Sequence, residues 1–97
     1  MLLNLQAHRC PNAQVLFNRA LEAFHRSLDS ELVIVTIEPS MERSVAGRIA
    51  GYDLPLQIAA VTASAISESD LELWKSNFDE EDYSDVLNIV TITIKKV

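Results

Sequence analysis

The stretch Leu32-Val33-Ile34-Val35-Thr36-Ile37 indicates the fold class. It is a continuous run of apolar and β-branched residues, which is typical of a central strand that is covered on both faces or nearly so. Pro39 ends the run. A strand of this kind needs neighbouring strands and at least one covering layer, so we expect the flanking sequence to supply both.

A helix is predicted on each side of this strand. In the first, apolar residues recur at steps of three and four from Pro11 to about Leu28, and they are Ala13, Leu16, Phe17, Ala20, Leu21, Phe24 and Leu28. Ser40 is a suitable N-cap for the second helix, which is expected to run to about Ala50, and Gly51 fits its C-terminal end. The apolar stripe of this second helix is expected to consist of Met41, Val45, Ala46 and Ile49.

Three further strands are predicted. The clearest is Val86–Lys95, in which apolar side chains alternate with threonine and lysine, so one face is expected to be covered and the other wetter. Leu56–Ala65 follows Pro55 and is interpreted as another strand, and Leu2–Gln6 as a short first strand.

An acidic segment separates the last two strands. Ala63–Asp85 contains eight acidic residues and one lysine, a net charge of −7, whereas the whole chain carries −6. Ser69-Asp70-Leu71-Glu72 matches a capping box, and Leu71, Trp74 and Phe78 are spaced along one helical face, which predicts a short helix and then an acidic loop over Asp79–Asp85. The spacing of Trp74 is typical of a packed residue, although tryptophan is also enriched at protein interfaces.

These elements predict an α/β (α+β) two-layer sandwich of order β-α-β-α-β-β. Two helices are expected on one face of a four-stranded mixed sheet, with an inserted acidic helix and loop before the last strand. Ninety-seven residues suit one domain, residues 1–97, with the acidic insertion at about 63–85. An edge strand of such a sheet can pair with a second copy, so either a monomer or a weak dimer is expected.

The composition argues against several functional classes. The acidic balance argues against direct binding to nucleic acid, which needs clustered lysine and arginine. No run approaches the ~20 apolar residues of a membrane span, and the N-terminal residues do not resemble a signal peptide, so a cytoplasmic protein is expected. One cysteine and two histidines lack the spacing of a metal site, and neither a metal nor another cofactor is predicted.

Cys10, the only cysteine, lies in the string His8-Arg9-Cys10-Pro11. Pro11 is suited to the first helical position, which would make Cys10 the N-cap and would stabilise a thiolate at the positive end of the helix. Arg9 would add a positive charge. Two alternatives stay open: Cys10 is a small buried residue, or His8 serves as its base rather than lying in a solvated loop.

Two groups of residues resemble a known family. Arg9-Cys10-Pro11 opens the first predicted helix, and Glu38-Pro39, followed by Arg43 and Gly47, opens the second. This arrangement resembles the TusA/SirA-like sulfur-carrier family, which has an Arg-Cys-Pro-x-Pro motif and an Asp-Pro-x-x-x-Arg motif on the same elements. The chain departs from the family pattern at Ala13, where the family has a second proline, and in the acidic insertion.

The resemblance implies that Cys10 accepts sulfur as a persulfide and passes it to another protein thiol, with Arg9, Pro11 and Arg43 as supporting residues. It implies a cysteine desulfurase or a rhodanese-like protein as sulfur donor, and a protein acceptor in a relay for tRNA thiolation or other sulfur metabolism. The alternative is a non-catalytic interaction or regulatory module whose acidic insertion docks a protein partner. Arg43 has a simpler interpretation as a surface partner of Glu38 or Glu42.

Overall fold

The predicted central strand is β2 (Glu31–Thr36) in the computed structural model, which describes residues 1–97. It lies inside a four-stranded sheet of order β1-β2-β4-β3. β1 (Leu2–Asn4) pairs with it in parallel, and β4 (Asn88–Lys96) pairs with it in antiparallel register, with Ile34 opposite Ile92. β3 (Leu56–Ala65) pairs antiparallel with β4 at the other edge. The expected mixed α+β fold is confirmed.

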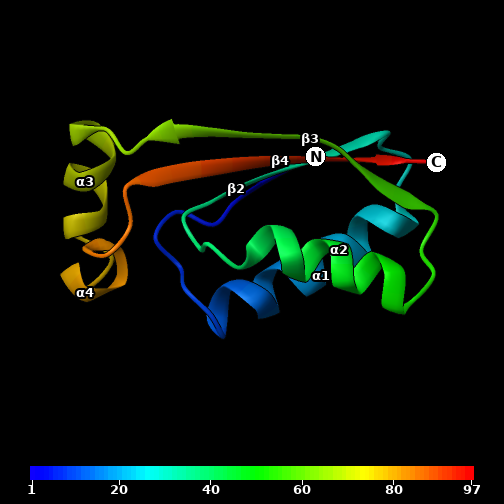
Figure 1. Ribbon diagram of the computed structural model, residues 1–97, viewed down its shortest axis with the longest axis horizontal. Coiled ribbons are helices and arrows are strands. Elements are labelled where there is room, and N and C mark those ends of the chain that lie inside the picture. The colour runs from blue at the N-terminus through cyan, green and yellow to red at the C-terminus, as the bar shows by residue number, and fades with distance from the viewer.

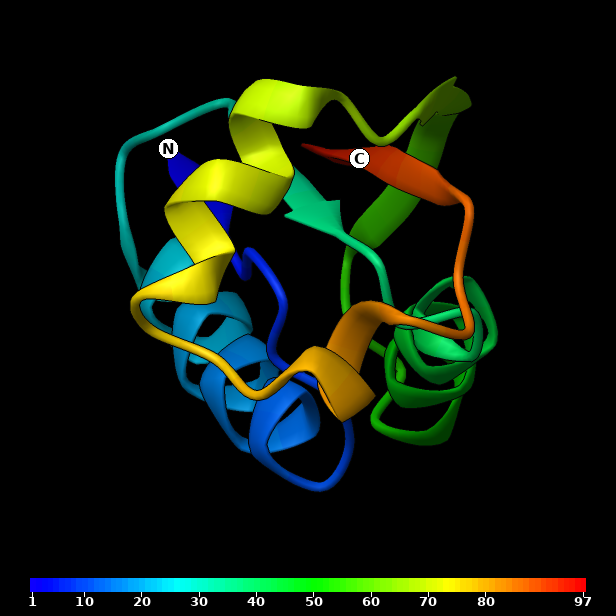
Figure 2. The same ribbon diagram turned by 90° about the vertical axis from the view of Figure 1, so that its left-hand side faces the viewer.

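Two helices lie along one face of this sheet (Figure 1). They are α1 (Asn12–Arg26) and α2 (Met41–Gly51), and Figure 2 shows them side by side beneath the strands. Their apolar stripes meet the sheet in the main core, whose buried members include Phe17, Leu21, Phe24, Leu32, Ile34, Met41, Val45, Ile92 and Ile94. Removing these side chains from water supplies most of the stability of such a domain.

The two helices differ from the sequence prediction in the end of α1 and in one residue of the apolar stripe of α2. α1 ends at Arg26, and Leu28 is fully exposed rather than part of the apolar stripe, because the Ser27 backbone N–H bonds the Phe24 carbonyl and closes the helix. In α2, Met41 and Val45 are buried and Ile49 packs against the core, but Ala46 is exposed.

The sheet is covered less completely than the run Leu32–Ile37 indicates. Along β2, Leu32, Ile34 and Thr36 are buried toward the helices, whereas Val33 and Val35 on the other face are only half-buried. β3 has the predicted bounds, but residues 59–65 are exposed, beyond a register shift between Ile58 and Ala60. In β4, Ile92 and Ile94 are buried toward the helices, whereas Thr91 and Thr93 lie on the opposite, less covered face, as the alternating sequence predicts.

The acidic segment contains two helices instead of the predicted one. α3 (Glu68–Lys75) begins with a capping box between Ser67 and Asp70, two residues before the predicted Ser69–Glu72 box. α4 (Glu80–Tyr83) replaces the predicted Asp79–Asp85 loop, since the Asp82 carboxylate accepts the backbone N–H of Asp79 and starts a turn of helix. Both helices lie at one end of the sheet (Figures 1 and 2).

A second, smaller core holds this pair of helices against the sheet. Trp74 of α3 and Tyr83 of α4 are buried together with Ala7 and Ile37, and the two aromatic rings lie 5.7 Å apart. The packed interpretation of Trp74 is therefore confirmed. None of the four helices is long and apolar enough to cross a lipid bilayer.

Candidate functional site

Cys10 lies in the connection between β1 and α1, and its side chain is exposed. The prediction that it is the N-cap is wrong by one position. α1 begins at Asn12, and Pro11, with φ −84° and ψ −12°, takes the N-cap position, one residue after Cys10. The Cys10–Pro11 peptide bond is cis. No backbone N–H donates to the Cys10 sulfur, so the thiol does not cap the helix.

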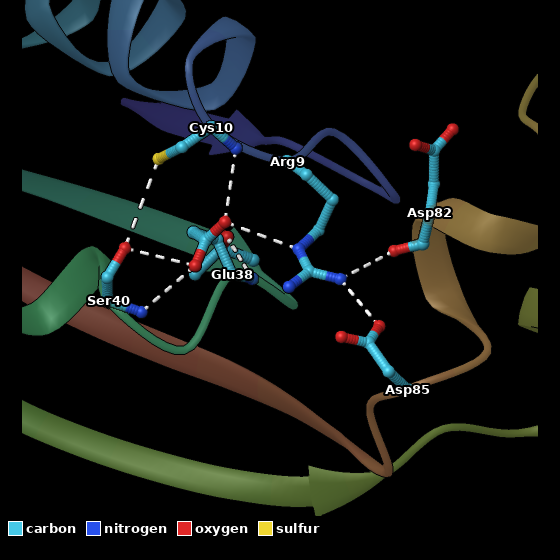
Figure 3. Close-up of polar contacts among 7 residues, drawn as sticks. Arg9, Cys10, Glu38, Ser40, Asp82 and Asp85 are labelled. Carbon is cyan, nitrogen blue, oxygen red and sulfur yellow. Dashed lines mark hydrogen bonds and ion pairs between the residues drawn. The ribbon is translucent and has the colours of Figure 1, made fainter.

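The Glu38 carboxylate, and not the thiol, accepts backbone N–H groups beside the helix starts. It accepts the backbone N–H of Cys10 at 3.1 Å, the backbone N–H of Ser40 at 3.1 Å and the Ser40 hydroxyl at 3.0 Å (Figure 3). The Glu38 backbone N–H in turn donates to the Thr36 hydroxyl at the end of β2. A negative group therefore lies where α1 and α2 both begin, and the helix dipoles favour it there.

The charge of Glu38 is strongly stabilised. Burial raises the pKa of Glu38, but the hydrogen bonds from Cys10, Ser40 and Arg9 outweigh that effect and lower the pKa to about 2. Only 9% of the residue is exposed, so its bonds are shielded from water. Glu38 is ionised at every physiological pH.

The Arg9 guanidinium points away from the sulfur. Its Nε donates to Glu38 at 3.2 Å, and its Nη1 donates to the Asp82 carbonyl at 2.8 Å and to the Asp85 carboxylate at 2.7 Å. Figure 3 shows the sulfur and the guanidinium on opposite sides of Glu38. The hydrogen bond from Arg9 lowers the pKa of Asp85. Arg9 therefore ties the Cys10 loop to the acidic segment.

This tie predicts the behaviour of an Arg9→Met variant. The loss of the Arg9 bonds to Glu38, Asp82 and Asp85 should loosen the chain around α4 and lower the free energy of unfolding. Hydrogen exchange of the peptide that spans residues 79–87 should become faster than in the wild type. Arg19→Met, which removes an exposed arginine of α1 without a hydrogen bond or ion pair, is the control. Equal protection of residues 79–87 in both variants would show that the Arg9 bonds do not hold this segment.

Ser40 is the only residue whose side chain contacts the sulfur through a polar atom. Its Oγ lies 3.9 Å from the Cys10 Sγ, and either atom can be the donor. Ser40 is the N-cap residue of α2, as predicted, but its hydroxyl does not cap the helix. It donates to Glu38 instead.

A cavity of about 550 Å³ opens beside Cys10. It lies between the Cys10 loop and the connection from α3 to α4, and its polar lining includes His8, Asn12, Lys75, Asp79 and Asp82. The His8 and Phe78 rings meet edge to face, with centroids 4.9 Å apart, so His8 is half-buried against the acidic segment rather than fully solvated. The thiol is thus reachable from an open, polar hollow.

Arg43 is separate from this cluster. It is exposed on α2 and makes neither a hydrogen bond nor an ion pair, with Glu38, Glu42 or any other residue. The structure therefore brings together Arg9, Cys10 and Pro11 but does not join Arg43 to them. No three cysteine, histidine, aspartate or glutamate side chains are grouped as metal ligands.

Sequence reasoning missed the central place of Glu38 and the contacts of Ser40 and Asp85. The available signal was a glutamate between a strand and a helix start, followed by Pro39 and Ser40, because acidic and hydroxyl side chains commonly bond the backbone at such a turn. Asp85 gave no local signal, since it lies 76 residues from Arg9. Comparison of the chain with protein-family models, with curated proteins and with solved structures found no match.

Proposed function

We propose that this protein carries sulfur as a persulfide on Cys10 and delivers it to a thiol of another protein. The observation that carries the proposal is the exposure of the only cysteine, at the start of α1 and beside an open polar cavity. A carrier needs a thiol that two larger proteins can reach in turn. It also benefits from the absence of a second cysteine in the chain, because a neighbouring thiol would collapse the persulfide into a disulfide.

The transfer step requires no external oxidant. The Cys10 thiolate attacks the outer sulfur of a donor persulfide, the bond between the two donor sulfurs breaks, and the donor leaves as a thiolate. Cys10 then carries the added sulfur as a persulfide, and the reverse chemistry on an acceptor thiolate unloads it. A reducing compartment such as the cytoplasm suits this cycle, because a free thiol persists there.

The spatial relation of the two motifs supports this proposal. Arg9-Cys10-Pro11 and Glu38-Pro39 are 28 residues apart at Cys10 and Glu38, yet Glu38 bonds both Arg9 and the Cys10 backbone. Of the residues that resemble the TusA/SirA-like family, Arg9, Cys10 and Glu38 therefore form one bonded unit, whereas Arg43 and Gly47 lie outside it. By that resemblance, the donor is a cysteine desulfurase or a rhodanese-like protein.

Sulfur loading tests the proposal directly. The protein should be incubated with a cysteine desulfurase and cysteine and then analysed by intact mass spectrometry. We expect the mass to rise by one sulfur atom or more and to return to its original value on reduction. The Cys10→Ser variant should gain nothing.

A matched control separates the site from simple thiol exposure. In the double variant Cys10→Ser with Ser30→Cys, the thiol is moved to an exposed turn at the far side of α1. We expect at least about a tenfold slower loading there, since exposure alone does not position a thiol for transfer. Failure of the wild type to load from any desulfurase or rhodanese-like donor would count against the carrier function.

The acidic segment favours a second candidate, an interaction module. Asp79, Glu80 and Glu81 are exposed near the Cys10 cavity and make no ion pair, and Arg9 is already engaged. Such a surface would bind a basic protein partner, and its association rate would fall with salt. A protein that never loads sulfur but binds a partner in a salt-sensitive manner would fit this module and not the carrier.

A further inference from the structure

The Ser40 hydroxyl is the one side-chain donor within hydrogen-bond distance of the Cys10 sulfur. Its single proton is directed at Glu38 Oε2, 3.0 Å away, so an oxygen lone pair remains to face the sulfur. The neutral thiol can then donate its S–H to the Ser40 oxygen. The resting arrangement is a chain in which Cys10 donates to Ser40 and Ser40 donates to Glu38.

This chain cannot persist when the sulfur ionises. A thiolate has no proton to donate, and it would face the lone pair of Ser40. The Glu38 oxygen Oε2 keeps the backbone N–H of Ser40 at 3.1 Å, so Glu38 does not lose all its contacts if the hydroxyl turns away. Rotation about the C–O bond of serine is a small movement within a side chain that is only partly exposed.

No positively charged side chain contacts the Cys10 sulfur, so a thiolate there would depend on a neutral hydrogen-bond donor. Glu38 is a negative group on the β2–α2 connection, and it opposes a second negative charge nearby. Arg9 is bound to Glu38 and Asp85. Lys75 in the cavity lining is paired with Glu72 and shares the cavity with Asp79 and Asp82, and Arg43 of α2 makes no ion pair.

We propose that Ser40 is a catalytic residue of the transfer: its hydroxyl turns from Glu38 to the Cys10 sulfur and donates a hydrogen bond to the thiolate. The thiol proton leaves to solvent, because the sulfur is exposed. The same bond stabilises the thiolate that is released when the carried sulfur departs. The role in transfer rests on the proposed function, whereas the effect on the thiolate does not.

The rate of alkylation by iodoacetamide tests the proposal as a function of pH, because only the thiolate reacts. Ser40→Ala and Ser40→Gly should both shift the rate profile to higher pH and slow the reaction at pH 7, because neither variant can donate a hydrogen bond to the thiolate. Ser40→Thr keeps the hydroxyl and should restore the wild-type profile. Ser44→Ala, also on α2, should leave the profile unchanged.

The outcomes separate this inference from the carrier function. An unchanged profile in Ser40→Ala and Ser40→Gly, or a loss that Ser40→Thr does not restore, overturns the role of the hydroxyl. Glycine is well tolerated at helix N-caps, so the Ser40→Gly variant keeps the test valid if Ser40→Ala is poorly folded. A wild type that shows the Ser40 effect but never loads sulfur would refute the carrier function alone, since alkylation needs no sulfur donor.

Discussion

A Glu38→Gln variant is expected to be about 3 kcal/mol less stable than the wild type at pH 7 and almost as stable near pH 2. The Glu38 carboxylate holds Cys10, Ser40 and Arg9 through charge-assisted hydrogen bonds, and these lower its pKa from 4.5 to about 2. A pKa difference of this size corresponds to about 3 kcal/mol of stabilisation by the ionised form. Glutamine resembles the protonated acid and lacks that contribution.

The sign of the pH dependence follows from the lowered pKa. As pH falls through 4.5, the unfolded chain takes up a proton at Glu38 before the folded chain does. The stabilisation is therefore complete above about pH 5 and is lost between about pH 4.5 and pH 2. Urea unfolding of both proteins at several pH values should show the gap closing over this range.

A control variant distinguishes this effect from general acid destabilisation. Glu42→Gln removes an exposed carboxylate in the first turn of α2 that makes no ion pair, and its stability should stay within about 0.5 kcal/mol of the wild type at every pH. If Glu38→Gln and Glu42→Gln behave alike, the carboxylate of Glu38 does not hold the two helix starts together.

Trp74→Ala is expected to lower the free energy of unfolding by about 3–5 kcal/mol. Trp74 is 3% exposed, and its ring packs against Tyr83, Ile37 and Ala7 in the smaller core. Truncation removes a large apolar surface and leaves a cavity that the short helices α3 and α4 cannot fill. Chemical denaturation checks the magnitude.

In Trp74→Ala, α3 and α4 should also lose their protection from hydrogen exchange before the rest of the domain unfolds. α3 and α4 reach the rest of the protein mainly through this smaller core and the Arg9 bonds. Hydrogen exchange in residues 68–83 of Trp74→Ala should therefore rise before that of α1. Leu73→Ala, at a neighbouring residue that is 55% exposed, should change stability by less than about 1 kcal/mol. Equal losses in the two variants would mean that the smaller core contributes little.

Local sequence patterns were sufficient for most of the fold. The period of α1, the alternation in β4 and the β-branched run of β2 each placed their element to within about three residues, because each pattern reports which side of one element is buried. The prediction for the acidic segment was weaker. A turn of helix as short as α4 is held by only a few bonds, among them the bond from the Asp79 N–H to the Asp82 carboxylate, and aspartates are also common in turns and loops.

The site was predictable in its residue types but not in its contacts. Arg9, Cys10 and Glu38 were all identified by their motifs. The sequence prediction placed the charge of Arg9 beside the sulfur, whereas the structure directs the guanidinium to Glu38, Asp82 and Asp85. Being next to Cys10 along the chain does not determine where a long guanidinium points. It bonds the buried Glu38 carboxylate, and it also bonds the Asp82 carbonyl and the exposed Asp85 carboxylate.

By itself, the amino-acid sequence predicted the element order apart from α4, the helices that cover one face of the sheet, and a lone cysteine beside a proline at a helix start, since all three depend on residue type and local period. Only the tertiary structure placed a carboxylate between the two helix starts, turned Arg9 toward the acidic segment and put a serine hydroxyl beside the sulfur. These contacts join residues that are 28 to 76 positions apart. Bonds across such separations form only after the packed core has fixed the distance between their elements, and no local pattern records that distance.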